Sequence, residues 1–242
     1  MGTLRFTLPQ RPNADHILEA KMATYEEVQH GFSMPLNEAM ETQRAVRRLK
    51  QDPIDDEILL AILRLATKAP TGGNAQGWEF IAVRDPEVKH AIARLNRMSW
   101  SLARRIYRKK LQGDEKAARM IEAVQWQADH FEDAPVIIVA CLHGRAFLTP
   151  MIRSSFYGSI YPAVQNLLLA ARSIGLGAAL TTLPLWSQTL ARRTLNLPRG
   201  ITPVAVIPLG WPVRGGYGPN TRKPLEEVLH LDHYGNRVFL DA

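Results

Sequence analysis

Arginines are concentrated in residues 43–49, which read Gln-Arg-Ala-Val-Arg-Arg-Leu. An arginine keeps its charge at neutral pH, and its planar guanidinium can donate two hydrogen bonds to one phosphate group. Arg44 and Arg47 are therefore candidates for binding the phosphate of a cofactor. A solvent-facing helix would account for the same cluster, so the segment by itself leaves both interpretations open.

A glycine-rich loop is predicted at residues 70–77, which read Pro-Thr-Gly-Gly-Asn-Ala-Gln-Gly. Glycine lets the backbone approach a ligand closely, and the amide side chains of Asn74 and Gln76 both donate and accept hydrogen bonds. The loop is either part of a binding site or a connection that needs glycine in order to turn. A third polar stretch, residues 220–225, carries Arg222 near the end of the chain.

These segments must be positioned by helices and strands, whose hydrophobic pattern can be followed along the chain. Helices are expected from Leu36, over residues 56–69 with Asp55 as N-cap, over most of 87–133 with a break near Gly113, and over 161–174 with Pro162 in the first turn. Strands are expected at residues 78–83, 135–142, 176–183 and 203–209. Strands separated by helices predict an α/β (α+β) fold in which helices pack on a sheet. The helix over 161–174 is apolar around nearly its whole circumference, which indicates a core or a subunit interface.

Composition and charge exclude several classes of protein. With 46% hydrophobic and 22% charged residues, the chain is expected to be globular and cytoplasmic, because it shows neither a signal peptide nor an apolar run that could cross a bilayer. Cys141 is the only cysteine and lies in an apolar run, so a buried hydrophobic residue is expected rather than a nucleophile. The histidines show no ligand spacing, so no metal is predicted. The net charge of +7 would suit nucleic acid, anionic lipid or an anionic ligand such as a phosphorylated cofactor, but no nucleic-acid-binding motif accompanies it.

In order and separation, these segments resemble the nitroreductase family. That family has an Arg-Arg-Ser-Val-Arg-type segment, then an Ala-Pro-Ser-(small)-x-Asn-x-Gln-Pro-Trp loop before a strand, and later an Ala-x-Gln-Asn-Leu-x-Leu-Ala-Ala helix ending in Gly-Leu-Gly. It closes with a Gly-x-Pro segment and a basic Lys-x-Arg-x-Pro-Leu motif. The corresponding residues here are 43–49, 69–78, 163–177, 210–212 and 220–225, so the resemblance runs from about Pro35 to Leu231.

The resemblance implies a site for flavin mononucleotide (FMN). Arg44, Ala45 and Arg47 match the family's cofactor-binding segment, although Ala45 replaces the usual serine. Arg222 matches the basic residue that reaches the FMN phosphate, while Asn220 replaces the usual lysine beside it.

The resemblance also implies residues around the flavin ring. The loop that approaches the flavin from the other subunit corresponds to Pro70, Thr71, Gly72 and Asn74, with Gly77 in place of the usual proline. The backbone that lies against the ring corresponds to Thr181, Thr182 and Leu183. Pro184 has no N–H, so the donor to flavin N5 is expected from a neighbour such as Leu183 or Leu185. Gln127 is expected to face the pyrimidine edge.

By the same resemblance, the chain is expected to form an intertwined homodimer with FMN at the subunit interface, built on a central mixed sheet flanked by helices. Residues 1–34 are expected to be an N-terminal extension and residues 35–242 a nitroreductase-like FMN-binding domain. The expected activity is a ping-pong transfer of two electrons from NADPH or NADH, through flavin N5, to small electron-poor acceptors such as nitroaromatics or quinones. The alternatives are another flavin reaction on this fold, namely reductive dehalogenation or oxygen-dependent flavin fragmentation, and a non-catalytic flavin-binding protein.

Several aromatic residues are candidates for the walls of such a pocket, although aromatic residues are also ordinary core material. These candidates are Trp78, Trp100, Trp126, Phe147, Tyr157 and Trp186. The insertion at residues 96–130 is a candidate for capping the site and setting the substrate range, a question that the sequence leaves open.

Overall fold

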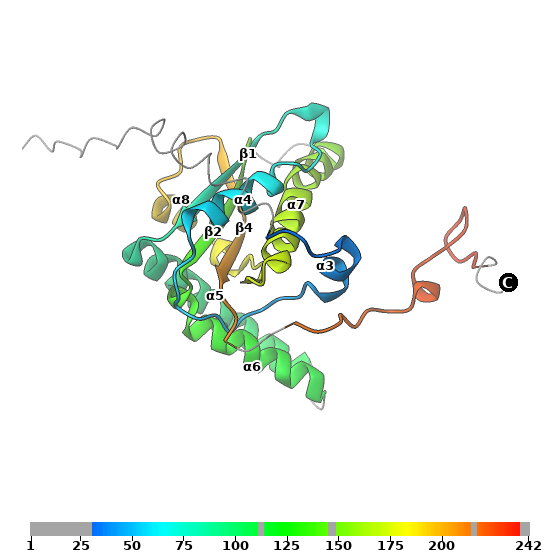
Figure 1. The fold of residues 1–242 in the computed structure, drawn as a ribbon, viewed down its shortest axis with the longest axis horizontal. Helices are drawn as coiled ribbons and strands as arrows, with labels where there is room; N and C mark the ends of the chain where they lie inside the picture. Colours follow the sequence, from blue (N-terminus) through cyan, green and yellow to red (C-terminus); the bar gives the residue numbers. More distant parts are fainter. Residues whose placement is uncertain (1–30, 111–113, 145–148, 214–216, 238–242) are drawn as a thin grey trace, which may run out of the picture.

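The computed structural model describes residues 31–110, 114–144, 149–213 and 217–237, apart from the side chains of 108–110 (Figure 1). Most of the expected N-terminal extension therefore lies outside the described residues. The helices are α3 (Leu36–Thr42), α4 (Asp56–Ala66), α5 (Pro86–Lys110), α6 (Glu115–Asp129), α7 (Pro150–Ser173) and α8 (Gln188–Thr194). The strands are β1 (Trp78–Val83), β2 (Val136–His143), β3 (Gly177–Ala178) and β4 (Ile201–Gly210). Short 3-10 helices are η1 (Gly72–Asn74), η2 (Phe131–Asp133), η3 (Leu183–Leu185) and η4 (Leu225–Glu227).

The strands form a sheet in the order β1-β2-β4-β3, and all three pairings are antiparallel. A mixed sheet was predicted, but among the described residues the parallel component is limited to an isolated bridge between Ala45 and Ala178. The bridge fastens residues 43–49, the arginine segment, to the β3 edge of the sheet. The arginine segment thus joins the edge of the sheet, although it does not form a regular strand.

Helices cover both faces of the sheet, as expected from the sequence (Figure 1). Strand β2, which is buried from Val136 to Leu142, connects the two layers, because successive side chains of a strand point to opposite faces. Ile138 and Ala140 pack with α4 and α7, whereas Ile137 and Val139 pack with α5, η2 and α8. The two hydrophobic cores are therefore separated by one sheet.

Several local predictions are confirmed. Strand β1 has the predicted bounds, and α5 and α6 are separate helices on either side of Gly113. Asp55 occupies the N-cap of α4, although its side chain makes no capping hydrogen bond.

Strand β3 is much shorter than the strand predicted over residues 176–183, and a proline on β4 accounts for this. Gly177 pairs with Gly210, Ala178 pairs with Leu209, and a bridge between Thr181 and Val206 keeps the same register. Between these pairs Ala179 lies opposite Pro208 and donates to its carbonyl at 3.4 Å. Pro208 has no N–H to return a hydrogen bond, so the ladder is interrupted at this pair.

Helix α7 begins eleven residues before the predicted start at Tyr161. The Thr149 side chain accepts a hydrogen bond from the Ile152 N–H at 3.3 Å, and Pro150 occupies the first helical position. Threonine followed by proline is a common helix start, and this signal was available in the sequence. The prediction that Pro162 lies in the first turn is wrong, because Pro162 lies inside the helix.

Cys141 is fully buried in β2, as predicted. Burial raises the pKa of its thiol to about 12, with Glu79 adding to the rise and Arg192 opposing it. A buried cysteine of this kind fills space in the core and does not act as a nucleophile.

We expect the thiol of the native protein to react with a disulfide reagent at pH 8 roughly a thousandfold more slowly than the same thiol in denaturant, because the thiolate is the reactive form and burial raises the pKa of this thiol from 9.0 to about 12. The native rate should rise only as the pH approaches 12. Equal rates with and without denaturant, measured by release of the coloured thiol, would contradict this burial.

Within the described residues, no helix combines the length and the apolarity needed to cross a membrane. The same residues include no group of three or more histidine, cysteine, aspartate or glutamate side chains that could hold a metal ion.

Candidate functional site

The arginine segment lines a cleft of about 670 Å³ together with α6 and the start of the C-terminal segment. Arg47 is partly buried, and the pKa of its guanidinium is lowered, first by burial and then by the neighbouring charge of Arg44. In the described part of the chain, no carboxylate forms an ion pair with Arg44 or Arg47. Two like charges held together without a counter-charge favour an anionic ligand. The solvent-facing alternative therefore does not describe Arg47.

The cleft is also lined by Ala123 and Trp126 of α6 and by Tyr217. Arg48 pairs with Glu122 at 3.3 Å and lies 5.9 Å from the ring centroid of Trp126. The Tyr217 hydroxyl is buried and has no hydrogen-bond partner in the described residues. Burial raises the pKa of Tyr217 to about 12, although the charge of Arg172 opposes this rise. The phenol is therefore a neutral hydrogen-bond donor at the cleft.

Arg172 was not predicted, because it lies on a helix that the sequence pattern presents as apolar on nearly all sides. Its guanidinium carbon lies 4.0 Å from the centroid of the Tyr217 ring, and its Nε donates to Thr42 Oγ1 at 2.8 Å. The signal for this contact was a single arginine at the end of an apolar helix. Its partners are far away in the sequence, so they could not be identified from the pattern.

The sheet edge connects the arginine segment to the second predicted group, Thr181, Thr182 and Leu183. The Val46 N–H donates to the Ala178 carbonyl at 3.0 Å, and Thr181 bonds to Val206 in both directions at 2.9 Å. The four residue-to-residue steps from Ala178 to Thr182 span at most ~14 Å even when fully extended. The structure therefore places the arginines and Thr182 along one edge, within reach of a single elongated ligand.

The expected backbone donors near Pro184 are already used inside the protein. The Leu183 N–H donates to Thr181 Oγ1 at 3.2 Å, and the Leu185 N–H donates to the Thr182 carbonyl at 2.9 Å. Thr182 is exposed, and in the described residues neither its N–H nor its hydroxyl has a hydrogen-bond partner. Thr182 is thus the residue of this group whose donors are available to a ligand.

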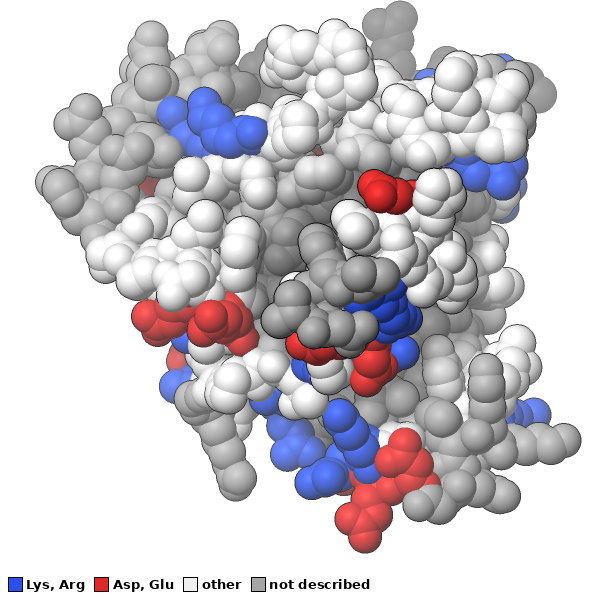
Figure 2. Space-filling model, turned by 90° about the vertical axis from the view of Figure 1, so that its right-hand side faces the viewer, with Lys and Arg blue, Asp and Glu red and all other residues white. Residues whose placement is uncertain are grey.

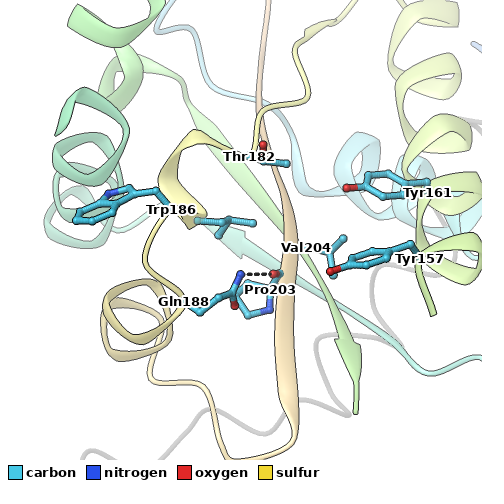
Figure 3. Close-up of a pocket in the computed structure, with 8 residues that line it drawn as sticks. Tyr157, Tyr161, Thr182, Trp186, Gln188, Pro203 and Val204 are labelled. Carbon is cyan, nitrogen blue, oxygen red and sulfur yellow. Dashed lines mark hydrogen bonds between the residues drawn. The ribbon is translucent and has the colours of Figure 1, made fainter. Parts of the chain in front are cut away.

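A groove of about 570 Å³ begins at Thr182 and continues between α7, η3 and β4 (Figure 3). Tyr157 and Tyr161 point into it from α7, and Trp186 lies on the opposite side. Two of the six aromatic candidates, Tyr157 and Trp186, therefore line this groove. Trp126 lines the arginine cleft, Trp100 is buried in the core, and Trp78 packs against the core. Phe147 lies outside the described residues.

The glycine-rich loop lies at the other end of the sheet from the arginine segment. Gly77 precedes Trp78, which pairs with Leu142, whereas the Ala45 bridge lies beside Ala178 at the end where Val136 pairs with Leu209. A single chain therefore does not bring the predicted loop residues, Pro70, Thr71, Gly72 and Asn74, to the arginine cleft.

The loop nevertheless has a defined conformation. The Ser159 hydroxyl accepts a hydrogen bond from the Gly72 N–H at 3.2 Å, and Thr71 Oγ1 accepts one from the Gln76 N–H at 3.0 Å. Asn74 adopts a left-handed backbone conformation with φ of 53°, which asparagine tolerates better than most residues. The exposed loop borders another cavity, of about 420 Å³, beside the first half of α7.

Arg222 lies on the C-terminal arm, residues 220–237, which runs away from the body of the protein past α3 (Figure 1). The arm is fastened by Asn220, whose Nδ2 donates to the Gln43 carbonyl at 2.6 Å and whose N–H donates to the Glu41 carbonyl at 2.8 Å. These bonds hold Asn220 against Gln43 of the arginine segment, and Arg222 follows Asn220 by two positions. Its only hydrogen bond in the described residues is to the Thr221 carbonyl.

Gln127 does not line the cleft, although its neighbours Ala123 and Trp126 on α6 do. Its side chain is buried, and Nε2 has no hydrogen-bond partner among the described residues. The insertion at 96–130 therefore reaches the cleft through α6, but not through the residue that was predicted.

Positive charge is not spread as a continuous basic surface over the face shown in Figure 2. Lys and Arg side chains alternate with Asp and Glu toward its lower edge. The described residues on this face thus offer no extended track of the kind that binds a nucleic-acid backbone.

Comparisons with known proteins agree with the predicted resemblance. The family model described as "Nitroreductase family" matches residues 40–211, a span that contains every predicted site residue except Arg222. An iodotyrosine deiodinase of Nematostella vectensis is 28% identical over 212 residues, which is 85% of this chain and 78% of that protein. A protein of Methanothermobacter thermautotrophicus with the provisional name NADH dehydrogenase/NAD(P)H nitroreductase is 28% identical over 204 residues, which is 83% of this chain and 88% of that protein. The crystal structure of oxidized iodotyrosine deiodinase bound to FMN and 3-iodo-L-tyrosine is 26% identical, with a TM-score of 0.60 over 82% of this chain and 98% of that chain.

Proposed function

Because this chain belongs to the nitroreductase family, we propose that it is an FMN-dependent oxidoreductase that passes two electrons from NAD(P)H to a small electron-poor acceptor. The observation that carries the proposal is the pair Arg44 and Arg47, which have no ion-pair partner in the described residues and lie along the same sheet edge as the exposed Thr182. Bound FMN would supply the electron transfer, and the protein would bind it, orient it and limit access to it.

The described residues fit such a cofactor. Arg47, partly buried beside Arg44, would bind the phosphate with Ala45 next to it, and Arg222, two residues after the Asn220 that is bonded to the Gln43 carbonyl, would contribute to the same site. Thr181 and Leu183 would support the ring through their backbone, and Thr182 would donate to it, since the N–H groups of Leu183 and Leu185 are occupied. The cleft volume of about 670 Å³ lies within the usual range of cofactor sites.

We propose that the active form is a homodimer in which FMN lies at the subunit interface. The glycine-rich loop and the arginine segment lie at opposite ends of one sheet, so a site that needs both requires two copies. Leu36 and Met40 on α3, and Leu225 and Val228 on the arm, are more than half exposed. Exposed apolar residues of this kind favour burial against a second copy.

Reductive dehalogenation is the second candidate, because the relative from Nematostella vectensis and the FMN-bound structure are both named iodotyrosine deiodinase. The reaction would consume two electrons and one proton, and it would replace a carbon–halogen bond by a carbon–hydrogen bond with release of halide. The two candidates share the cofactor and differ in the acceptor.

The proposal is tested by anaerobic spectroscopy of the purified protein after incubation with FMN. A bound flavin band that bleaches on adding NADPH or NADH, and returns on adding a nitroaromatic or a quinone, is the expected result. Return of the band with release of iodide from 3-iodo-L-tyrosine would instead favour dehalogenation. Bound flavin that neither donor reduces faster than free FMN would favour a non-catalytic binding protein. A protein that retains no FMN would refute the proposed function.

A further inference from the structure

Tyr217 carries a hydroxyl group whose partner is missing from the described residues. Its oxygen is buried and has no hydrogen-bond partner among them, although a buried polar group without a partner costs free energy. The residue lines the same cleft as Arg44 and Arg47, the arginine pair. A donor that lacks a partner, in a cleft that also carries two arginines, indicates that its partner is an acceptor on an anionic ligand.

Backbone and side-chain hydrogen bonds hold Tyr217 beside the arginine segment. The Val213 N–H, four positions before it, donates to the Arg48 carbonyl at 3.1 Å. Asn220, three positions after it, donates through Nδ2 to the Gln43 carbonyl at 2.6 Å. These two bonds fall on either side of the arginine pair, so Tyr217 is fastened next to the part of the segment that is proposed to bind the phosphate.

Arg172 holds the ring of Tyr217 in place. Arg172 is 9% exposed, and its guanidinium carbon lies 4.0 Å from the centroid of that ring. Thr42 orients the guanidinium, because its hydroxyl donates to the Glu38 carbonyl at 2.6 Å and accepts from Arg172 Nε at 2.8 Å. Within the described ranges no carboxylate forms an ion pair with Arg172, so its charge adds to the positive field of the cleft.

On the basis of the proposed function, we propose that the Tyr217 hydroxyl is a further donor to the FMN phosphate, beside Arg44 and Arg47, and that Arg172 is the residue that positions it. A phosphate oxygen would supply the acceptor that the buried hydroxyl lacks. Because burial raises the pKa of Tyr217 to about 12, the phenol keeps its proton and can donate it to an anionic group. Tyr217 would thus recognise the phosphate and not the flavin ring.

Two ligands that differ only in the phosphate, FMN and riboflavin, test this contact. Each is titrated into the flavin-free protein, and binding is followed by the change in flavin fluorescence. In Tyr217→Phe the affinity for FMN should fall by roughly tenfold or more, because a hydrogen bond to a charged group is lost, whereas the affinity for riboflavin should change by less than about twofold. Tyr234→Phe, at a tyrosine that is 94% exposed on the C-terminal arm, is the matched control and should bind both ligands as the wild type does.

Inorganic phosphate provides a second measurement that does not involve the flavin ring. Added as a competitor of FMN, it should bind Tyr217→Phe more weakly than the wild type, by roughly the same factor as FMN does.

The positioning role of Arg172 is tested by combining its variants with Tyr217→Phe. Arg172→Met should lower the affinity for FMN severalfold when Tyr217 is present, and should have little further effect in Tyr217→Phe, where no hydroxyl remains to be positioned. Arg172→Lys keeps a positive charge near the ring and should retain most of the affinity. A purely structural effect of Arg172 would appear equally in both backgrounds and with both flavins.

The outcomes separate this contact from the proposed function. Equal losses of affinity for FMN and riboflavin in Tyr217→Phe, or no loss of either, would overturn the contact and leave the proposed function standing. Wild-type protein that retains no FMN would refute the proposed function, and the contact with it. The melting temperature of the flavin-free protein identifies any variant that fails to fold. Tyr217→Phe should not lower it, because phenylalanine keeps the ring and removes a buried donor that has no partner in the described residues. If Arg172→Met fails to fold, Arg172→Gln, which also removes the charge, takes its place.

Discussion

Replacing Arg44 and Arg47 together by alanine is expected to abolish retention of FMN. A hydrogen bond to a charged group contributes ~1.5–3 kcal/mol, so losing both arginines should weaken binding by roughly a hundredfold or more. Arg47→Ala alone should have a larger effect than Arg44→Ala, because Arg47 is the partly buried member of the pair. The measurement is the ratio of flavin to protein absorbance after gel filtration, together with a titration of the FMN-free protein.

The FMN-free double variant should fold as well as the wild type, or slightly better. In the described residues neither arginine has a carboxylate partner, and burial and mutual repulsion lower the pKa of Arg47, so their removal relieves an unfavourable arrangement. Arg193→Ala, at an exposed position of α8, is the matched control and should retain FMN. Wild-type flavin content in the double variant would show that the phosphate is bound elsewhere.

Gly177→Ala is expected to destabilise the protein and to weaken FMN binding at the same time. A Cβ at this position would lie 2.8 Å from side-chain atoms of both Val46 and Leu49, closer than packed carbon atoms approach. Overpacking of this kind costs ~1–3 kcal/mol, which corresponds to a fall in melting temperature of roughly 2–12 °C for a domain of this size. Because Val46 lies between Arg44 and Arg47, any movement that relieves the contact also displaces the arginines.

Gly77→Ala is the matched control for this change. Its added Cβ would lie 3.7 Å from the His143 Cβ, an ordinary van der Waals contact, and the backbone of Gly77 has no positive φ. The expected change in unfolding free energy is within ~0.5 kcal/mol, as for most surface substitutions. If Gly177→Ala leaves both the melting temperature and the FMN affinity unchanged, the close contact does not position the arginine segment.

The sequence was sufficient where structure depends on neighbouring residues. The alternation and length of the apolar runs predicted β1 and the burial of β2, and the break at Gly113 separated α5 from α6. The fold class is confirmed, because helices pack on both faces of one sheet and the family model matches residues 40–211. The arginine segment was also recognisable, because residue type and spacing identify a phosphate-binding candidate without reference to the rest of the chain.

The tertiary structure decided whatever depends on residues that are distant in the sequence. Pro208 shortens β3 only because it lies opposite Ala179, and Arg172 meets Tyr217 only because α7 packs beside the C-terminal segment. The pairing of the strands placed the glycine-rich loop at the far end of the sheet from Arg44. Thr182, rather than Leu183, has available donors because the Leu183 N–H is already bonded to Thr181 Oγ1, a turn contact that the residue pattern does not specify. Local patterns specify which residues form a helix or a strand, but hydrogen-bond partners and neighbouring side chains are chosen when those elements pack, so the available donors became visible only in three dimensions.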